Sequence, residues 1–147
     1  MTRSSSELNA QMIEQILVNP AQPVADDGYG LRVVEIRGRR SGRPHRTPLG
    51  LTQVSGRQYL VCPDRRRDWV RNLRARVECI LLAGGEQQSR SAVPVEGEEA
   101  AVVVSVYLSA VKAPWALRAF PVAPGSSTTE IERHLGEMAV FRLDGGS

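Results

Sequence analysis

Short runs rich in β-branched residues, joined in pairs by turns, constrain the fold of this chain more than any other feature of its sequence. Five or six runs have this character: residues 31–36, 45–54, 58–62, 77–82, 88–95 and 138–143. The Ser55-Gly56 and Gly84-Gly85 pairs are typical two-residue hairpin turns. Because no regular alternation of strands and helices accompanies them, the sequence predicts a small, largely antiparallel barrel rather than a parallel sheet.

Helical patterns fill most of the remaining chain. Ser4 and Glu7 have the spacing of a capping box, and the apolar periodicity that follows ends at Pro20. Three later helices are expected: residues 66–76, 97–112 and 127–135. Residues 21–30 are expected to be a loop, and the Pro-rich residues 114–125 an irregular lid or a helical turn. We expect two or three helices around the strands in total. Arg90 and Glu96 are expected on the polar face of the second hairpin.

Size and composition predict one domain preceded by a short N-terminal element. At 147 residues the chain has the usual length of a single domain, so residues 1–30 are expected to form a helix and loop and residues 31–147 the folded domain. No stretch approaches the roughly 18 apolar residues of a membrane helix, and no signal peptide is recognisable. We therefore expect a cytoplasmic protein, with the N-terminal helix packed on the barrel. The alternative is that this helix covers a substrate site or touches a membrane or partner.

The two cysteines, Cys62 and Cys79, lie in apolar runs, and no Cys/His cluster has the spacing of a metal site. Buried free thiols and no metal are predicted. A disulfide is the alternative if the two strands are neighbours.

Arginine is concentrated in two places. Residues 37–46 hold five Arg residues, two Gly, a Ser and a His, and such a turn can bind anions through backbone N–H groups and guanidinium forks. Residues 65–67 are all Arg and open the helix that carries Trp69, and helix N-termini attract phosphate. The alternative explanations of these Arg clusters involve no ligand: a solvated hairpin, or a general genomic preference for Arg codons. Two anion sites on neighbouring elements favour one elongated ligand that carries phosphate.

A basic nucleic-acid-binding module is a weaker hypothesis, supported by an isoelectric point near 9.3. Single-strand binders need aromatic residues interleaved with the charge, yet the aromatic share is 5% and residues 37–46 contain none. We therefore expect a small-molecule substrate and no nucleic-acid partner.

The segments GRRSGRPHRTPL (residues 38–49) and WVRNLRA (residues 69–75) together resemble the deazaflavin-dependent nitroreductase family, which includes quinone reductases. The resemblance implies an α+β, mainly β split barrel of the FMN-binding, pyridoxamine-phosphate-oxidase-like type. It also implies coenzyme F420 as cofactor, with FMN as the alternative, and hydride transfer to an activated C=C bond, a quinone or a nitro compound. A homodimer is possible in such folds.

The resemblance also implies cofactor contacts, carried over by position. They are Arg39, Arg40, Ser41, His45, Arg46, Thr47, Pro48, Leu49, Gly50, Cys62, Pro63, Asp64, Arg65, Asp68, Trp69, Val70, Arg71 and Asn72. Ser41 and Thr47 are the expected hydrogen-bond donors near the ring.

Two departures from the family pattern concern the chemistry. Residues 63–65 shorten the family's phosphate loop and introduce Asp64, which repels phosphate unless a neighbouring Arg offsets it. Residues 114–129 lack the Tyr that helps place or protonate the substrate in relatives. Tyr107 and His134 are the remaining candidates for proton delivery. The alternative reading keeps the fold but replaces redox chemistry with a different ligand or a non-redox step.

Overall fold

The computed structural model describes residues 5–145 of the chain, and all structural statements below concern that range. Ser4 lies outside the described residues, so the predicted capping box stays a prediction. Within residues 5–145, no helix combines the length and the apolar character needed to cross a bilayer.

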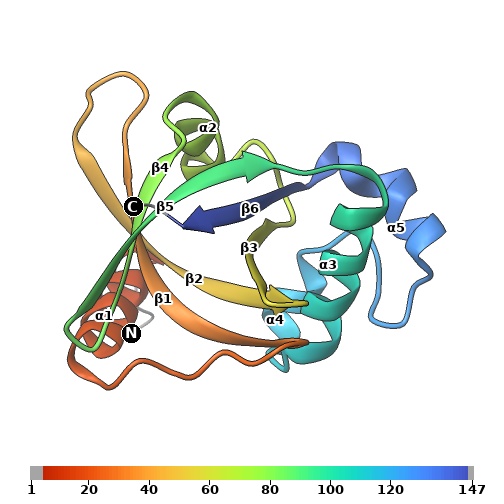
Figure 1. Cartoon of the computed structure of the whole chain (residues 1–147), viewed down its shortest axis with the longest axis horizontal. Coiled ribbons are helices and arrows are strands. Elements are labelled where there is room, and N and C mark those ends of the chain that lie inside the picture. Colours follow the sequence, from red (N-terminus) through yellow and green to blue (C-terminus); the bar gives the residue numbers. More distant parts are fainter. Residues whose placement is uncertain (1–4, 146–147) are drawn as a thin grey trace.

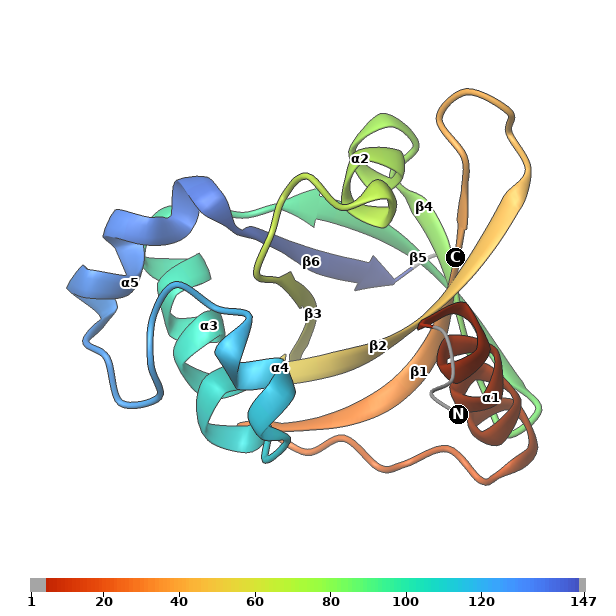
Figure 2. The same cartoon turned by 180° about the vertical axis from the view of Figure 1, so that it is seen from behind.

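Six antiparallel strands close into a barrel, as the sequence predicts (Figures 1 and 2). The strands are β1 (Gly28–Arg37), β2 (Pro44–Val54), β3 (Arg57–Cys62), β4 (Glu78–Ala83), β5 (Glu86–Pro94) and β6 (Ala139–Gly145). Their order around the barrel is β1-β2-β3-β6-β5-β4, and β4 pairs with β1 to close it. Four of the six neighbouring pairs join strands that are consecutive in the sequence, whereas the β1–β4 and β3–β6 pairs join strands that are distant in the sequence.

Tight turns set the register of two hairpins. Ser55 and Gly56 both adopt positive φ, 51° and 78°, and Gly84 and Gly85 do the same at 54° and 83°. Positive φ at both central residues gives a turn whose twist matches that of the flanking strands. The two predicted hairpins are therefore confirmed.

Five α-helices and one 3-10 helix flank the barrel, more than the two or three predicted. They are α1 (Ser5–Val18), α2 (Asp68–Ala75), α3 (Gly97–Ala110), α4 (Pro114–Arg118), α5 (Thr128–His134) and the 3-10 helix η1 (Leu135–Glu137). The Pro-rich segment thus contains a helical turn, with Pro114 in its first turn where the missing N–H is harmless. The Ser127 hydroxyl accepts a hydrogen bond from the Glu130 N–H, which fixes the start of α5.

Two boundary predictions are wrong for identifiable reasons. β1 begins at Gly28, inside the predicted loop, because Gly28 to Gly30 pair with the end of β2. Glu96 was predicted on a strand but is the N-cap residue of α3, so it does not share a strand face with Arg90.

Two apolar clusters hold the elements together. One fills the barrel: Val34, Ile36, Leu51, Leu60, Cys62, Val70, Leu73, Cys79, Leu81, Ala92, Ala139, Phe141 and Leu143. The other lies between the outer barrel wall and α3, α4 and α5, and includes Tyr59, Val104, Leu108, Phe120 and Ile131. In both ribbon views α3, α4 and α5 gather at one side of the barrel, α2 covers one end, and α1 lies away from α5 (Figures 1 and 2).

The two cysteines are buried free thiols, as predicted. β3 and β4 are not neighbours in the barrel, so the condition for the alternative disulfide is absent. Burial raises the pKa of Cys62, and it raises the pKa of Cys79 to about 11. Both thiols therefore stay protonated at neutral pH and serve as small apolar core groups.

Candidate active site

The barrel has an opening along one edge of β2. β2 pairs with β1 from Pro44 to Gln53, but β3 pairs only with its last residues, 51–54. In the described part of the chain, residues 44–50 therefore have a strand partner on one side only. An unpaired strand edge presents backbone N–H and C=O groups that a flat heterocycle with donors and acceptors can bind.

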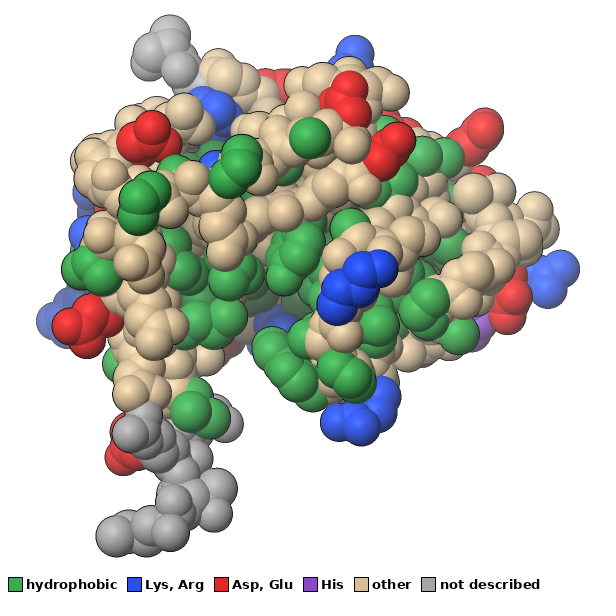
Figure 3. All heavy atoms as spheres, turned by 90° about the horizontal axis from the view of Figure 1, so that it is seen from below, with side chains coloured by type: hydrophobic (Ala, Val, Ile, Leu, Met, Phe, Trp, Pro, Cys, Tyr) green, Lys and Arg blue, Asp and Glu red, His purple; other side chains and the backbone are tan. Residues whose placement is uncertain are grey.

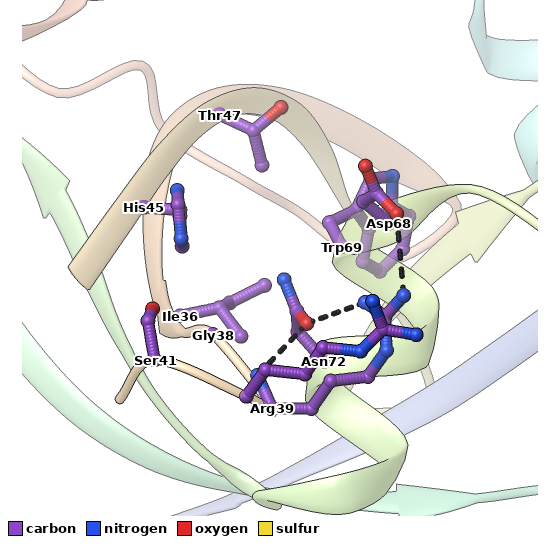
Figure 4. A pocket seen from close by; sticks show the side chains of 10 residues that line it. Ile36, Gly38, Arg39, Ser41, His45, Thr47, Asp68, Trp69 and Asn72 are labelled. Carbon is purple, nitrogen blue, oxygen red and sulfur yellow. Dashed lines mark hydrogen bonds and ion pairs between the residues drawn. The ribbon is translucent and has the colours of Figure 1, made fainter. Parts of the chain in front are cut away.

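A cavity of about 500 Å³ lies at one end of this edge, between the β1–β2 hairpin and α2 (Figure 4). We call it the hairpin cavity. It is lined by Ile36, Gly38, Arg39, Arg40, Ser41, His45, Thr47, Asp68, Trp69 and Asn72. The two Arg-rich segments of the sequence thus meet at one cavity.

The hairpin owes its shape to hydrogen bonds within its turn. The Gly38 N–H donates to the Arg43 carbonyl at 2.8 Å, and the Gly42 N–H donates to the Gly38 carbonyl at 2.9 Å. Gly42 has a φ of +72°, which favours glycine. The Ser41 hydroxyl accepts from the Arg43 N–H at 3.1 Å, so this side chain is held by its own turn.

Gly38 leaves room for two lining side chains to approach the backbone closely. A Cβ at this position would lie 2.9 Å from the Ser41 Oγ and 3.0 Å from the His45 Nε2. The missing side chain therefore lets a hydroxyl and an imidazole converge on the same wall of the hairpin cavity. In Figure 4, Ser41 and His45 lie on one side of the cavity, opposite Asn72.

Asn72 joins the hairpin to α2. Its Oδ1 accepts from the Arg39 backbone N–H at 3.0 Å and from the Arg39 guanidinium at 2.8 Å. The same guanidinium lies 3.6 Å from the Asp68 carboxylate, and the dashed lines in Figure 4 mark these contacts. Asn72 is buried, so it is a rigid link between two segments that are 33 residues apart in sequence.

The charge of the hairpin cavity is favourable for an anion. Arg39 is partly neutralised by Asp68, whose side chain is 85% exposed and therefore well solvated. Within residues 5–145, Arg40 has neither an ion pair nor a hydrogen bond from its side chain, and it lines the cavity. A guanidinium without a protein partner beside Ser41 and His45 is a suitable donor for phosphate oxygens.

Asp64 is neutralised by its neighbour, which answers the concern raised by its sequence position. The Arg66 guanidinium donates to both carboxylate oxygens at 3.0 Å, and the Arg66 N–H donates at 2.9 Å. These contacts lower the pKa of Asp64 to about 2. The Arg65 guanidinium instead donates to the Gly136 carbonyl at 3.0 Å, so it ties the loop to η1.

We expect a pH titration to reveal the Asp64–Arg66 pair. A depressed pKa means that the stabilisation is present above the usual carboxyl range and is lost as the pH falls from about 4 through about 2. An NMR titration of the Asp64 carboxyl should show a midpoint near 2 in the wild type and a higher midpoint in Arg66→Gln, still below the usual 3.8 because the backbone N–H of residue 66 and Arg67 remain. Arg65→Gln is the matched control and should leave the midpoint near 2. A wild-type midpoint near 3.8 would contradict the neutralised loop.

A second cavity of about 450 Å³ lies along the middle of the β2 edge, between α1 and α4. We call it the aromatic cavity because Tyr29, Trp69, Tyr107, Trp115 and Phe120 line it. Residues 47–50 form another part of its wall. Seen from below, hydrophobic side chains surround a hollow between α1 and α4 (Figure 3). Thr47 and Trp69 line both cavities, so the polar and the aromatic cavities are neighbours along one strand edge.

Comparison with known proteins gives the family. The model of the F420H(2)-dependent quinone reductase family matches residues 19–122, which span most of the chain and include both cavities' central segments. The chain belongs to the F420H(2)-dependent quinone reductase family. The resemblance inferred from residues 38–49 and 69–75 is therefore confirmed.

Solved structures support the fold of this quinone reductase family member. An F420-H2 dependent reductase is 18% identical over 84% of this chain and 99% of its own, with a TM-score of 0.51. A heme storage protein from Vibrio cholerae is 11% identical over 99% of this chain and 92% of its own, with a TM-score of 0.56. A protein described as a domain-swapped dimer is 17% identical over 78% of this chain and 79% of its own, with a TM-score of 0.53. A comparison with curated protein sequences gives no match.

The cavities bring together most of the residues that the sequence assigns to the cofactor of this quinone reductase family member. Besides the lining of the hairpin cavity, the aromatic cavity includes Pro48, Leu49, Gly50 and Pro63. Asp64 and Arg65 line a third cavity of about 530 Å³ between the residue 63–67 loop and η1, which shares Pro63 with the aromatic cavity.

Four of the assigned residues lie elsewhere. The side chains of Cys62 and Val70 belong to the barrel core. Arg46 pairs with Glu35 at 3.1 Å, and Arg71 is exposed on α2; neither lines the hairpin or aromatic cavity. The side chains of these four residues therefore lie outside the hairpin and aromatic cavities.

Of the two residues nominated for proton delivery, only Tyr107 lines a cavity. His134 lies on α5, where its Nδ1 is 2.8 Å from the Glu137 carboxylate, and it lines neither cavity. Sequence reasoning missed Tyr29, Trp115 and Arg67 as lining residues of the aromatic cavity. Tyr29 was placed in a loop, and recognising that β1 starts at Gly28 would have placed it one residue from a strand end.

Proposed function

We propose that the chain is an F420H2-dependent reductase that transfers a hydride to a small organic acceptor such as a quinone, an activated alkene or a nitro compound. Family membership supports the cofactor and the reaction type. The observation that carries the proposal is the adjacency of the two cavities along the unpaired β2 edge. One cavity has the charge for a phosphate, and the other has the apolar walls for a flat ring.

The residues present fit a phosphorylated deazaflavin. Arg39, Arg40 and Ser41 would hold the phosphate, with the convergence over Gly38 providing a fixed geometry. Residues 47–50 would contact the heterocycle through their unpaired backbone groups, with Trp69 as a neighbouring wall. When bound, the reduced cofactor supplies the hydride.

The aromatic cavity would receive the acceptor. Apolar and aromatic walls exclude water and favour flat, apolar molecules. Excluding water strengthens every polar interaction with the charge that develops on the acceptor. The shape of the aromatic cavity between α1 and α4 would select the acceptor, whereas the hairpin cavity would contact only the cofactor.

A fluorescence titration tests the proposed cofactor. Oxidised F420 should bind to the purified protein with a dissociation constant below about 50 μM, which corresponds to roughly 6 kcal/mol of binding energy. FMN, titrated in parallel, is the matched competitor. Unchanged F420 fluorescence at saturating protein would contradict the proposal, and tighter binding of FMN, or a yellow purified protein, would favour the flavin alternative.

We further propose a homodimer in the cytoplasm. The similarity to a protein described as a domain-swapped dimer supports the assembly but shows only a shared fold. Light scattering coupled to size-exclusion chromatography should give twice the chain mass of 16.1 kDa. A single-chain mass at micromolar concentration would contradict the dimer.

A further inference from the structure

The end of α3 presents a tyrosine to the aromatic cavity in a fixed orientation. The Tyr107 ring packs edge-on against Tyr29, with centroids 6.4 Å apart, and packs at a tilt of 43° against Phe120, with centroids 5.2 Å apart. Its carbonyl accepts the Val111 N–H that ends the helix. Two aromatic neighbours and a helical backbone leave this ring little freedom to turn.

The Tyr107 hydroxyl is available to a ligand. Within residues 5–145 it makes no hydrogen bond, and it is not among the buried side-chain atoms that lack a partner. The hydroxyl is therefore accessible and without a protein partner, on a side chain that lines the aromatic cavity. Tyr59, by contrast, donates to the Glu99 carboxylate at 2.9 Å and lines neither cavity.

Tyr107 also lies close to the unpaired β2 edge. A Cβ at Gly50 would be 3.8 Å from the Tyr107 Cε2 and 2.7 Å from the Tyr29 Cδ2. The absence of a side chain at Gly50 thus lets the Tyr29 ring lie against the strand, and Tyr29 in turn supports Tyr107. The phenol is therefore at the place where an acceptor would contact a heterocycle on residues 47–50.

We propose that the Tyr107 hydroxyl donates a proton to the acceptor as the hydride arrives, and that Tyr29 is the positioning residue that holds it. This inference rests on the proposed reductase function. For a quinone, the reduced deazaflavin would supply the hydride, which carries two electrons and one hydrogen, and would itself be oxidised as its C–H bond breaks. The Tyr107 O–H bond breaks as a new O–H bond forms on the acceptor. The tyrosinate regains its proton from water. No other oxidant or reductant is needed.

The surroundings of Tyr107 suit this role. Burial raises the pKa of its hydroxyl, with smaller contributions from Tyr29 and Cys62, while Arg67 acts in the opposite direction. The phenol is therefore fully protonated at neutral pH. Arg67 lines the same cavity and can stabilise the transient tyrosinate. Trp115, which lines the same cavity, has no comparably acidic proton.

A comparison of two phenol deletions tests the proposal, with F420H2 and menadione as the probe substrates. Tyr107→Phe should lower kcat by about 100-fold, the usual scale of general acid catalysis, while KM and the dissociation constant for F420 stay within about twofold. Tyr59→Phe removes the same atom from a phenol outside both cavities and should keep kcat within about twofold of the wild type. Equal kcat values in Tyr107→Phe and the wild type would overturn the assignment. A kcat loss in Tyr29→Phe without one in Tyr107→Phe would also overturn it.

A second readout does not depend on turnover. In protein with ¹³C-labelled tyrosine, the Tyr107 resonance should titrate above the ordinary phenol value of about 10 and should shift when menadione is added, whereas the Tyr59 resonance should not respond to menadione. A Tyr107 resonance that ignores menadione would overturn the proposal, even if Tyr107→Phe failed to fold. A wild type that binds F420 and reduces menadione while Tyr107→Phe is unaffected would refute only the proton donor. Failure of the wild type to bind F420 would refute the reductase function, and the proton donor with it.

Discussion

Arg39→Ala should weaken binding of F420 by about 10- to 100-fold. The change removes a charge-assisted donor beside the proposed phosphate position and one of the two hydrogen bonds from Arg39 to Asn72 on α2. Only 23% of the Arg39 side chain is exposed, so its position is well defined. Its guanidinium contacts both Asn72 and Asp68, which orient it toward the hairpin cavity. Fluorescence titration of the variant with oxidised F420 measures the effect.

The matched control removes one arginine from another surface. Arg90 on β5 donates only to Ser89 and Gln88, its own neighbours in the strand, and lines neither the hairpin nor the aromatic cavity. Arg90→Ala should therefore bind F420 within about twofold of the wild type, after the small loss of general positive charge is allowed for. Similar weakening in both variants would mean that net charge, and not the hairpin cavity, attracts the cofactor.

Asn72→Ala should reduce both stability and cofactor binding, because the two roles share one side-chain oxygen. The change leaves the Arg39 backbone N–H and guanidinium without their acceptor. We expect a loss of about 2 kcal/mol in the free energy of unfolding, which for a domain of this size lowers Tm by about 4–8 °C. F420 affinity should fall at least about 10-fold, because the hairpin is no longer fixed against α2. Thermal melts and the fluorescence titration measure the two effects.

Asn72→Asp separates the two roles. A carboxylate retains an oxygen that can accept both Arg39 donors, so most of the lost stability should be restored. The added negative charge lies in the cavity proposed for the phosphate, so F420 affinity should stay low. If Asn72→Asp were as unstable as Asn72→Ala, the hydrogen bonds to Arg39 would not be the reason for the stabilisation.

Local sequence signals predict the barrel well because the residues of each hairpin determine both its turn and its strands. Ser55-Gly56 and Gly84-Gly85 specify turns, and the apolar runs beside them specify strands. The last strand could be recognised by composition, but its place between β3 and β5 depends on pairing over more than 40 residues. Such non-local pairing has no signature in a single sequence.

The polar half of the site was also predictable, whereas the aromatic half was not. Residues 37–46 and 65–72 stand out by their charge, and the Arg39–Asn72 contact brings them together. The aromatic cavity is assembled from side chains on α1, β1, α3 and α4, each of which individually looks like ordinary core. Tyr29 and Trp115 become candidate site residues only because the fold brings them into the wall of one cavity.

Two positions inside the matching segments have side chains that face the barrel core. Val70 and Cys62 lie within matching segments, yet alternation along a strand and periodicity along a helix turn their side chains into the core. A motif conveys which segment lies near a ligand. Which side of the segment faces the ligand is decided by packing.

The most direct test of the central claim compares two ligands that differ only in the phosphate-bearing tail. Oxidised F420 and the same deazaflavin without its phosphate should be titrated into the wild type and into Arg39→Ala. We expect the wild type to bind F420 at least about 30-fold more tightly than the truncated deazaflavin, a difference of about 2 kcal/mol, and Arg39→Ala to lose most of this preference while its affinity for the truncated ligand stays unchanged. Equal affinity of the wild type for the two ligands would contradict a hairpin cavity that binds phosphate.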